Sequence, residues 1–213
     1  DGTIESFAIL QSAPDDWPTL RPHRLAIGIY QQHDGGVTRV HRIECDIDGE
    51  RTDIPQLRGI DRGDMIIPND DDLAYAKIRL DEQSMGFALE HLDAISSPLT
   101  RSLVWSAAWD ATRDGEMPAR DFRTLILSNL AAETESTTIR TVLGQLQVVT
   151  KLYADPVTVP GAQLEVGDRL WQMTRSAPPG SDAQFQFLKA FSQVASTADH
   201  GAILQSLRDG NTV

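Results

Sequence analysis

Three consecutive aspartates, Asp70 to Asp72, are the first residues in this sequence that suggest chemistry. A calcium loop surrounds its ion with about six or seven oxygens, and it uses a glycine turn and a terminal bidentate glutamate to do so. The stretch Asn69–Asp81 reads NDDDLAYAKIRLD and contains neither glycine nor glutamate. We therefore interpret the run as a solvated turn, with a calcium site as the less favoured alternative.

The histidines do not form a zinc-binding pattern. They are His23, His33, His41, His91 and His200. A zinc peptidase helix carries H-E-x-x-H, which places two imidazoles on one face, and no histidine pair has this spacing. His41 and Glu44 come close in sequence, but in a strand they point to opposite faces. We therefore expect no metal ligand among these residues.

Residues for nucleophilic catalysis are missing as well. The sequence contains neither a G-x-S-x-G turn nor a phosphate-binding glycine loop. Cys45 is the only cysteine and lies in a β-prone segment, where an inward thiol is usually a small core residue. Trp105 and Trp109 lie one helical turn apart, and packing between helices is favoured over ligand stacking. We assign no catalytic, metal or cofactor-binding residue, and substrate-binding residues stay unassigned.

Composition argues against several kinds of partner. The 213 residues carry a formal net charge of −12, which repels phosphate backbones, so we expect no nucleic acid. No apolar run approaches the roughly 20 residues that cross a bilayer, and we expect no membrane association. A single cysteine fits the reducing cytoplasm. Because the sequence begins at Asp1 without a methionine, we expect a fragment of a longer chain.

The first third of the sequence predicts short β-strands. Apolar residues alternate in His23–Gln32 and in Val37–Asp48, and HDGG at His33–Gly36 is a hairpin turn between them. Further short strands are expected at Thr3–Gln11, Thr52–Ile54 and Met65–Pro68. This close spacing predicts an antiparallel sandwich. The alternation in Leu73–Asp81 favours a hairpin that closes the sandwich, although a weak helical stripe leaves a helix open.

The last two thirds change to a helical period. Ser84 is expected to cap the first helix, and Ser97 the second, with Pro98 at its first position. Ser181, followed three residues later by Gln184, has the pattern of a capping box. Apolar stripes accompany these signals, so several amphipathic helices are expected in sequence.

These patterns predict an α+β multidomain chain. Residues 1–81 would form a small antiparallel β-sandwich domain, and residues 82–213 an α-helical domain of packed, solenoid-like helical pairs. Pro156 and Pro160 are expected to interrupt the helices with an irregular linker. The residues alone predict no function beyond this architecture.

Several separated segments resemble the aminopeptidase N family of zinc metallopeptidases, most closely its actinobacterial members. They occur in the order FAILQSAP (7–14), LRPHRLAIGIY (20–30), NDDDLAYAKIRLDEQS (69–84), PLTRSLVWSAAWDATRDGEMPARDF (98–122) and PPGSDAQFQFLKAF (178–191). The resemblance runs from about Phe7 to about Phe191, and its specificity comes from the shared order of the segments. It implies that this chain is the C-terminal region of such an enzyme, namely the β-sandwich and the first part of its larger helical domain.

The family resemblance also implies an activity for the full-length enzyme. Such an enzyme is a gluzincin that removes N-terminal residues from peptides, with zinc held by a catalytic domain of the same chain. That domain carries H-E-x-x-H, a distant glutamate and a G-x-M-E-N-type segment, and this chain contains neither motif. The chain alone is therefore expected to bind no zinc and to be inactive. It would help to enclose and gate the substrate chamber, with a hinge at Asp81–Ser84 as a hypothesis.

Two other functions stay open at this point. The chain could be a stand-alone interaction module, in which a helical array binds a protein partner and the sandwich acts as a cap. A carbohydrate-binding sandwich is weaker, because such a site uses an exposed strip of aromatic residues. Tyr30 is the only aromatic residue in Leu20–Ile60.

Overall fold

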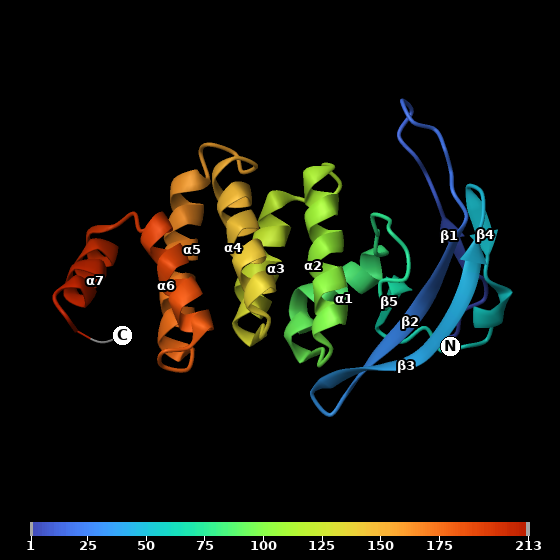
Figure 1. Cartoon of the computed structure of the whole chain (residues 1–213), viewed down its shortest axis with the longest axis horizontal. Helices are drawn as coiled ribbons and strands as arrows, with labels where there is room; N and C mark the ends of the chain where they lie inside the picture. Colours follow the sequence, from blue (N-terminus) through green and yellow to red (C-terminus); the bar gives the residue numbers. More distant parts are fainter. Residues whose placement is uncertain (1, 212–213) are drawn as a thin grey trace. The chain divides into compact units, whose positions relative to one another are not determined.

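The computed structural model describes residues 2–211, and its first third forms two small antiparallel sheets (Figure 1). The strands are β1 (Ala8–Leu10), β2 (His23–His33), β3 (Gly36–Ile47), β4 (Arg51–Asp53) and β5 (Met65–Asp70). β1 pairs with β4, and β2 lies between β3 and β5 in the larger sheet. The antiparallel pairing and the α+β class that the sequence predicts are confirmed.

The hairpin between β2 and β3 follows from its turn residues. Asp34 and Gly35 have φ angles of 49° and 83°, and His33 pairs with Gly36 on either side of them. Two successive positive φ angles match the right-handed twist of the strands, and Asp-Gly tolerates them best. The hairpin predicted from HDGG is confirmed.

The β region is held together by one apolar cluster. It consists of Ile4, Leu25, Ile27, Ile29, Cys45, Ile47, Ile54, Leu57 and Ile66. Cys45 is a buried free thiol that contacts the carbonyl oxygen of Leu25, as expected of a core residue. Burial raises the pKa of this thiol, so it stays protonated and unreactive at neutral pH.

Leu73–Asp81 forms neither a strand nor a helix, so the predicted hairpin is wrong. Asn69, Asp71 and Asp72 all adopt positive φ angles, which turn the chain out of the sheet. The side chain of Asn69 then accepts a hydrogen bond from the N–H of Ala74 and donates one to its carbonyl oxygen, at 2.8 and 2.7 Å. These are the backbone groups that a partner strand would have used.

The remaining residues form helices with short connections. They are α1 (Glu82–His91), α2 (Pro98–Arg113), α3 (Ala119–Asn129), α4 (Ser136–Lys151), α5 (Val159–Ser176), α6 (Asp182–Val194) and α7 (Ala198–Arg208). Short 3-10 helices lie at Pro55–Leu57, Leu92–Ala94 and Leu130–Ala132. Within residues 2–211, no helix has both the length and the apolar character that a membrane span requires.

Two predicted helix caps are present and one is displaced. The hydroxyls of Ser97 and Ser181 accept hydrogen bonds from the N–H groups three residues later, at 3.2 and 3.1 Å. Ser84, by contrast, does not cap α1. The carboxylate of Asp81 accepts from the N–H of Ser84 at 2.9 Å, and α1 therefore begins at Glu82.

The sequence analysis did not predict helix α5. Pro160 lies in its first turn, where a backbone N–H has no helical partner and a proline costs nothing. The irregular linker therefore ends before Val159, which is the first residue of this helix. The expected irregular linker is confirmed at Pro156, which lies between α4 and α5. The expectation is wrong for Pro160, because this proline lies in the first turn of α5.

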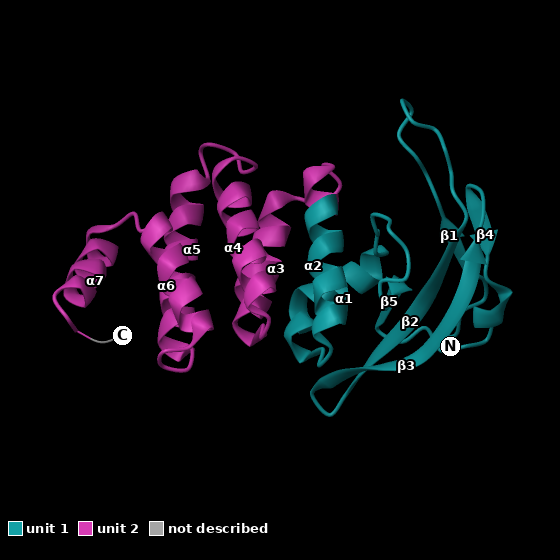
Figure 2. Cartoon of the chain, viewed as in Figure 1, with its two compact units in different colours: residues 1–110 teal, residues 111–213 magenta. Residues whose placement is uncertain are grey.

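The chain divides into two compact units, residues 1–110 and residues 111–213 (Figure 2). Unit 1 contains the strands, α1 and most of α2, with α1 packed on β5. In unit 2, α3 packs on α4 and α5 packs on α6. The last strand ends at Asp70 and the first α-helix begins at Glu82. The domain boundary between residues 81 and 82 stays a prediction.

Candidate functional site

The aspartate run lies at the end of β5, and it is only partly solvated. Asp70 is fully buried, Asp71 is half-buried and Asp72 is exposed. The interpretation as a solvated turn is therefore wrong for Asp70. A buried carboxylate needs hydrogen-bond donors or a cation beside it, because leaving water is costly for a charge.

A tyrosine of β2 and an arginine of β3 supply these partners, and a second arginine of β3 bonds to the neighbouring Asp71. The hydroxyl of Tyr30 donates to Asp70 at 2.8 Å, and Arg39 Nη1 donates to Asp70 at 2.7 Å. Arg39 Nη1 also lies 2.8 Å from Asp71, which accepts a second bond from Arg42 Nε at 2.7 Å. We call Tyr30, Arg39, Arg42, Asp70 and Asp71 the arginine–aspartate cluster.

The cluster also reaches the first turn of α2. The Tyr30 and Thr100 hydroxyl oxygens lie 3.1 Å apart, and both side chains are buried. Because the Tyr30 hydrogen points to Asp70, its oxygen is left to accept the hydrogen of Thr100. A backbone bridge between Val37 and Ile95 joins β3 to the residues just before α2. The cluster therefore fastens the three-stranded sheet to this helix within unit 1.

Neighbouring charges and burial move the pKa values of Tyr30, Arg39 and Asp71 away from neutral pH. Burial, with the charge of Asp70 adding to it, raises the pKa of Tyr30. Hydrogen bonds to Asp70 and Asp71 raise the pKa of Arg39, and those from Arg39 and Arg42 lower the pKa of Asp71. A general acid or base works best with a pKa near the working pH. The cluster is therefore suited to holding structure, and acid–base catalysis is not supported.

A glycine on β2 makes room for the buried carboxylate. A Cβ atom at Gly28 would lie 2.7 Å from Asp70 Cγ and 2.9 Å from Tyr30 Cε2, closer than real Cβ contacts come. Its φ angle lies outside the left-handed region, so the requirement at this position is space.

Polar side chains also stabilise Asp81–Ser84, which we call the joint between strands and helices. Arg62 Nη2 pairs with Asp81 at 2.5 Å, and the Ser84 hydroxyl donates to the same carboxylate at 2.8 Å. The N–H of Ile66 in β5 donates to Ser84 Oγ at 2.9 Å. A shallow groove lined by Thr3, Phe7, Arg62, Asp81 and Gln83 runs beside this joint.

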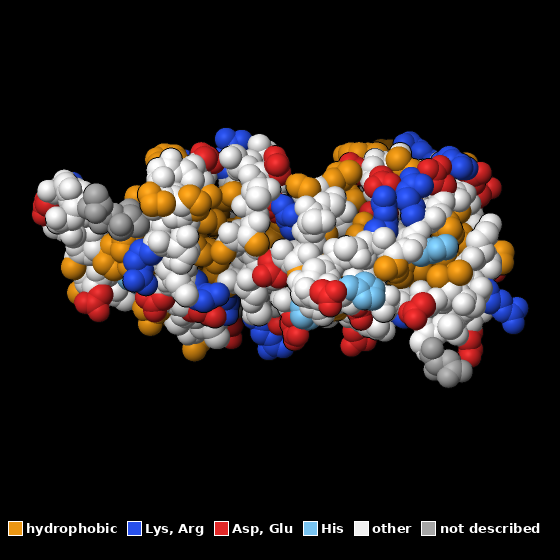
Figure 3. All heavy atoms as spheres, turned by 90° about the horizontal axis from the view of Figure 1, so that it is seen from below, with side chains coloured by type: hydrophobic (Ala, Val, Ile, Leu, Met, Phe, Trp, Pro, Cys, Tyr) orange, Lys and Arg blue, Asp and Glu red, His pale blue; other side chains and the backbone are white. Residues whose placement is uncertain are grey.

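The five histidines are not brought together. His200 is buried and lies 2.9 Å from Asp168, and His41 has a buried Nε2 without a hydrogen-bond partner. Among residues 2–211, no three His, Cys, Asp or Glu side chains are grouped so that they could hold a metal ion. Residues 2–211 do not fit a zinc site, and guanidinium groups neutralise Asp70 and Asp71 instead. Figure 3 shows acidic and basic side chains intermixed on one face of the molecule.

Sequence reasoning missed the arginine–aspartate cluster and the His200–Asp168 pair. The usable signal was an acidic turn directly after a strand, together with two arginines on the hairpin strand Val37–Asp48. Opposite charges that alternate with apolar residues on neighbouring strands favour cross-strand pairs. Nothing in the local sequence says which strands are neighbours.

Comparison with known proteins assigns the chain to a family. The model of the ERAP1-like C-terminal domain family matches residues 65–209. The chain is also 40% identical over 217 residues to aminopeptidase N of Streptomyces lividans, a match that covers 99% of this chain and 25% of that protein. The chain thus spans about a quarter of the length of this relative, and the predicted resemblance to aminopeptidase N is confirmed. Since the family match covers more than half of its residues, from β5 to α7, the chain belongs to the ERAP1-like C-terminal domain family.

Proposed function

We propose that this chain is a non-catalytic portion of a zinc-dependent aminopeptidase that removes N-terminal residues from peptides. The observation that carries the proposal is the 40% identity to an aminopeptidase N along 99% of the chain. Because the sequence lacks H-E-x-x-H, a structural role is favoured over a catalytic one. A cytoplasmic location belongs to the same proposal, and the buried free thiol of Cys45 is compatible with it.

The zinc of the whole enzyme would be held elsewhere in the parent protein. There it would polarise the peptide carbonyl and activate a water molecule. The residues of this chain would hold together a part of the protein that encloses the substrate. The arginine–aspartate cluster and the bonds at Ser84 support this role, because they fix the first helices of unit 1 to its sheet.

We also propose that the chain helps to enclose and gate a chamber that admits peptides. A gate needs a part that moves, and the hinge hypothesis placed it at Asp81–Ser84. The ion pair of Asp81 with Arg62 and the bond from Ile66 to Ser84 argue against free rotation there. Gating motion would therefore have to come from another segment.

Hydrolysis of an alanyl or leucyl chromogenic substrate tests the proposal. The full-length gene product and this chain alone would be assayed side by side with added zinc. Activity in the full-length protein and none in this chain would support a non-catalytic portion of an aminopeptidase. Activity in this chain alone would overturn the non-catalytic role.

The alternative is a stand-alone protein-interaction module. The segment between α4 and α5 favours it, because three large apolar side chains are exposed close together in sequence there: Leu152 at 74%, Tyr153 at 45% and Val157 at 87%. The same assay separates the two functions. A folded full-length product without peptidase activity would favour the interaction module and overturn the enzyme proposal.

A further inference from the structure

The arginine–aspartate cluster continues along β3 to the protein surface. Arg42 Nη2 donates to Glu44 at 2.8 Å, and the other oxygen of Glu44 accepts from Arg24 Nε at 3.1 Å. Arg24 Nη1 donates in turn to Asp46 at 3.0 Å. The side chain of Asp46 is 78% exposed, whereas that of Asp70 at the other end is fully buried. We call Arg24, Glu44 and Asp46, together with the cluster, the charge line.

Positive and negative side chains alternate along the charge line. Each of the inner carboxylates, Glu44, Asp71 and Asp70, uses its two oxygens for two different donors. Each arginine of the line lies within 3.1 Å of two different carboxylates. Removing the charge of Glu44 or Asp71 would therefore leave two arginines without the negative charge that separates them.

Small residues of β2 leave space for the arginines of β3 to cross the sheet. Because β2 lies between β3 and β5, the side chain of Arg42 has to cross β2 to reach Asp71, which directly follows β5. The β2 residues opposite Arg42 and Glu44 are Gly28 and Ala26. Directly opposite residues of an antiparallel pair share a face, so larger side chains at these two positions would occupy the crossing path. The register of the strands thus supports the charge line.

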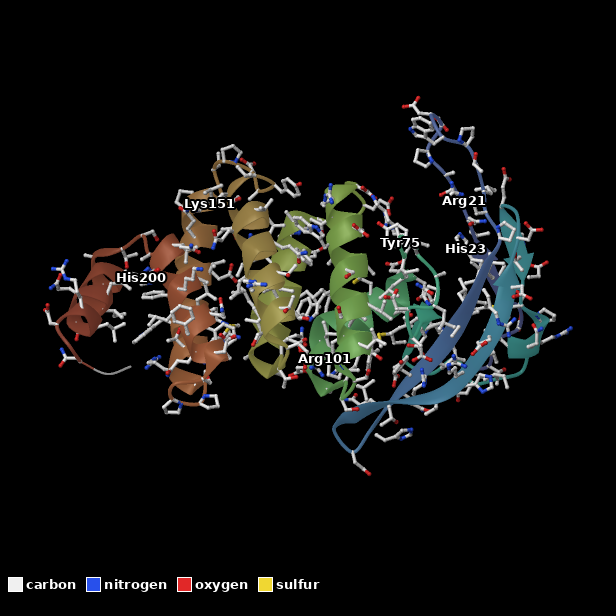
Figure 4. The ribbon with its side chains drawn as sticks, in the orientation of Figure 1. Arg21, His23, Tyr75, Arg101, Lys151 and His200 are labelled. Carbon is white, nitrogen blue, oxygen red and sulfur yellow. The ribbon has the colours of Figure 1, made fainter. Side chains whose placement is uncertain are left out.

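A connected line differs in energy from separate surface ion pairs. A single exposed pair contributes little to stability, whereas several charges in a network can contribute more. Hydrogen bonds from Arg42 and Arg24 lower the pKa of Glu44, which keeps its carboxylate charged at neutral pH. Glu44 is therefore able to bridge the two arginines. Figure 4 labels His23, which precedes Arg24 in β2, and Arg101, which follows Thr100 in α2, and the contacts described here run between these two ends.

We propose that the charge line acts as one unit, and that Glu44 is a positioning residue for the buried contact of Tyr30 with Asp70. Since each inner carboxylate bridges two donors, the position of one charge depends on charges several steps away in the line. Tyr30 also contacts Thr100, so Glu44 helps to set the docking of α2 on the sheet. This inference does not depend on the proposed enzymatic function.

A charge swap distinguishes one line from separate pairs. The variant Arg42→Glu/Glu44→Arg keeps an ion pair between the two positions with its signs exchanged. In a line, however, the new charges lie beside Arg24 and Asp71, which have the same signs. In urea unfolding of the whole chain, we therefore expect the swap to keep at least about half of the midpoint loss of the worse single variant. Recovery of the wild-type midpoint would overturn the charge line.

Arg51 and Asp53 provide the matched control for the swap. Like Arg42 and Glu44, they lie two residues apart on one strand, with 2.8 Å between Nη2 and the carboxylate. Within residues 2–211, neither Arg51 nor Asp53 has a second ionic partner. Arg51→Asp/Asp53→Arg should therefore unfold at the wild-type midpoint. A swap at positions 42 and 44 that recovers as fully as this control would contradict the proposal.

A double-mutant cycle tests the positioning role of Glu44. Glu44 and Tyr30 share no hydrogen-bond partner, so the effects of Glu44→Gln and Tyr30→Phe would simply add if the two sites were independent. We expect the midpoint loss of Tyr30→Phe to be at least about one third smaller in the Glu44→Gln background. Equal losses in the two backgrounds would show that Glu44 does not position the buried contact.

Salt gives a measurement that a packing role of Glu44 would not change. At about 1 M sodium chloride the Debye length falls to about 3 Å, which weakens charge interactions near the surface. The difference in urea midpoint between wild type and Glu44→Gln should then shrink by at least about half. If the difference is the same at low and high salt, Glu44 acts through packing and the proposal is wrong.

Discussion

The hydroxyl of Tyr30 lies 2.8 Å from the carboxylate of Asp70, 40 residues later in the chain, and both side chains are buried. This contact joins the central strand of the larger sheet to an edge strand. The shared contact of Tyr30 with Thr100 extends it to α2. A single phenolic hydroxyl thus links three elements of unit 1.

Tyr30→Phe is expected to lower the free energy of unfolding by about 1–3 kcal/mol. The substitution keeps the ring and removes one donor from the buried carboxylate of Asp70. Denaturant unfolding would measure the change. Tyr75→Phe is the control, since Tyr75 is fully exposed and its hydroxyl should contribute less than about 0.5 kcal/mol. Equal effects of the two substitutions would show that the buried hydrogen bond adds nothing.

Acid sensitivity is expected from Asp71. Arg39 and Arg42 lower its pKa in the folded chain, whereas an unfolded aspartate titrates at about 3.9. Its contribution to stability is thus present above the unfolded pKa, and it is lost as the pH falls through the folded pKa. The stability difference between wild type and Asp71→Asn should be largest near neutral pH and shrink in acid.

Denaturant unfolding at a series of pH values would measure that difference. Asp72→Asn is the matched control, because Asp72 is exposed and its hydrogen bond is to the amide of Asn69. A difference for Asp71→Asn that stays constant from neutral to acid pH would mean that the two arginines do not stabilise its charged form.

Local chemistry explains which parts of the fold could be predicted from the sequence. The turn at Asp34–Gly35 needs positive φ angles, and the residues that tolerate them are visible in the sequence. Ser97 and Ser181 cap helices within three residues of themselves. In each case the partner is a near neighbour, so no knowledge of the tertiary fold is required.

The features that sequence reasoning missed depend on distant partners. Asp70 is buried because β5 pairs with β2, which places its carboxylate beside Arg39. His200 finds Asp168 only once α7 folds back on α5. The N-cap of α1 is a local feature, and the sequence still predicted the wrong residue, Ser84, because serine and aspartate are both good caps. The structure has Asp81 as the cap. The bond from Ile66 occupies the Ser84 hydroxyl and leaves the cap to the aspartate.

Ser84→Ala tests whether the joint between strands and helices is rigid. The substitution leaves the N–H of Ile66 buried without its acceptor, which should cost about 1–3 kcal/mol and speed exchange of that amide. Ser192→Ala is the control, as this serine is exposed on α6 and donates to its own helix. Similar small effects of both substitutions would restore Asp81–Ser84 as a possible hinge.

Gly28→Ala is expected to lower the stability of the fold, whereas Gly36→Ala is expected to leave it unchanged or raise it slightly. Neither glycine has a positive φ angle, so alanine should cost no backbone strain and should reduce the entropy of the unfolded chain. At Gly36 the nearest atom to the new Cβ is 3.8 Å away, and the change should be neutral or slightly stabilising. At Gly28 the Cβ would overlap Asp70 and Tyr30, so a loss of about 1–3 kcal/mol is expected in denaturant unfolding.

The double variant Gly28→Ala/Asp70→Ala identifies the source of that loss. If the buried carboxylate is what the glycine accommodates, Gly28→Ala should cost less in the Asp70→Ala background than in wild type. Additive effects would instead place the overlap at Tyr30. A stabilising Gly28→Ala would contradict the close packing of β2 against Asp70. It would also contradict the inference that a glycine is needed at position 28 to leave space for the buried carboxylate.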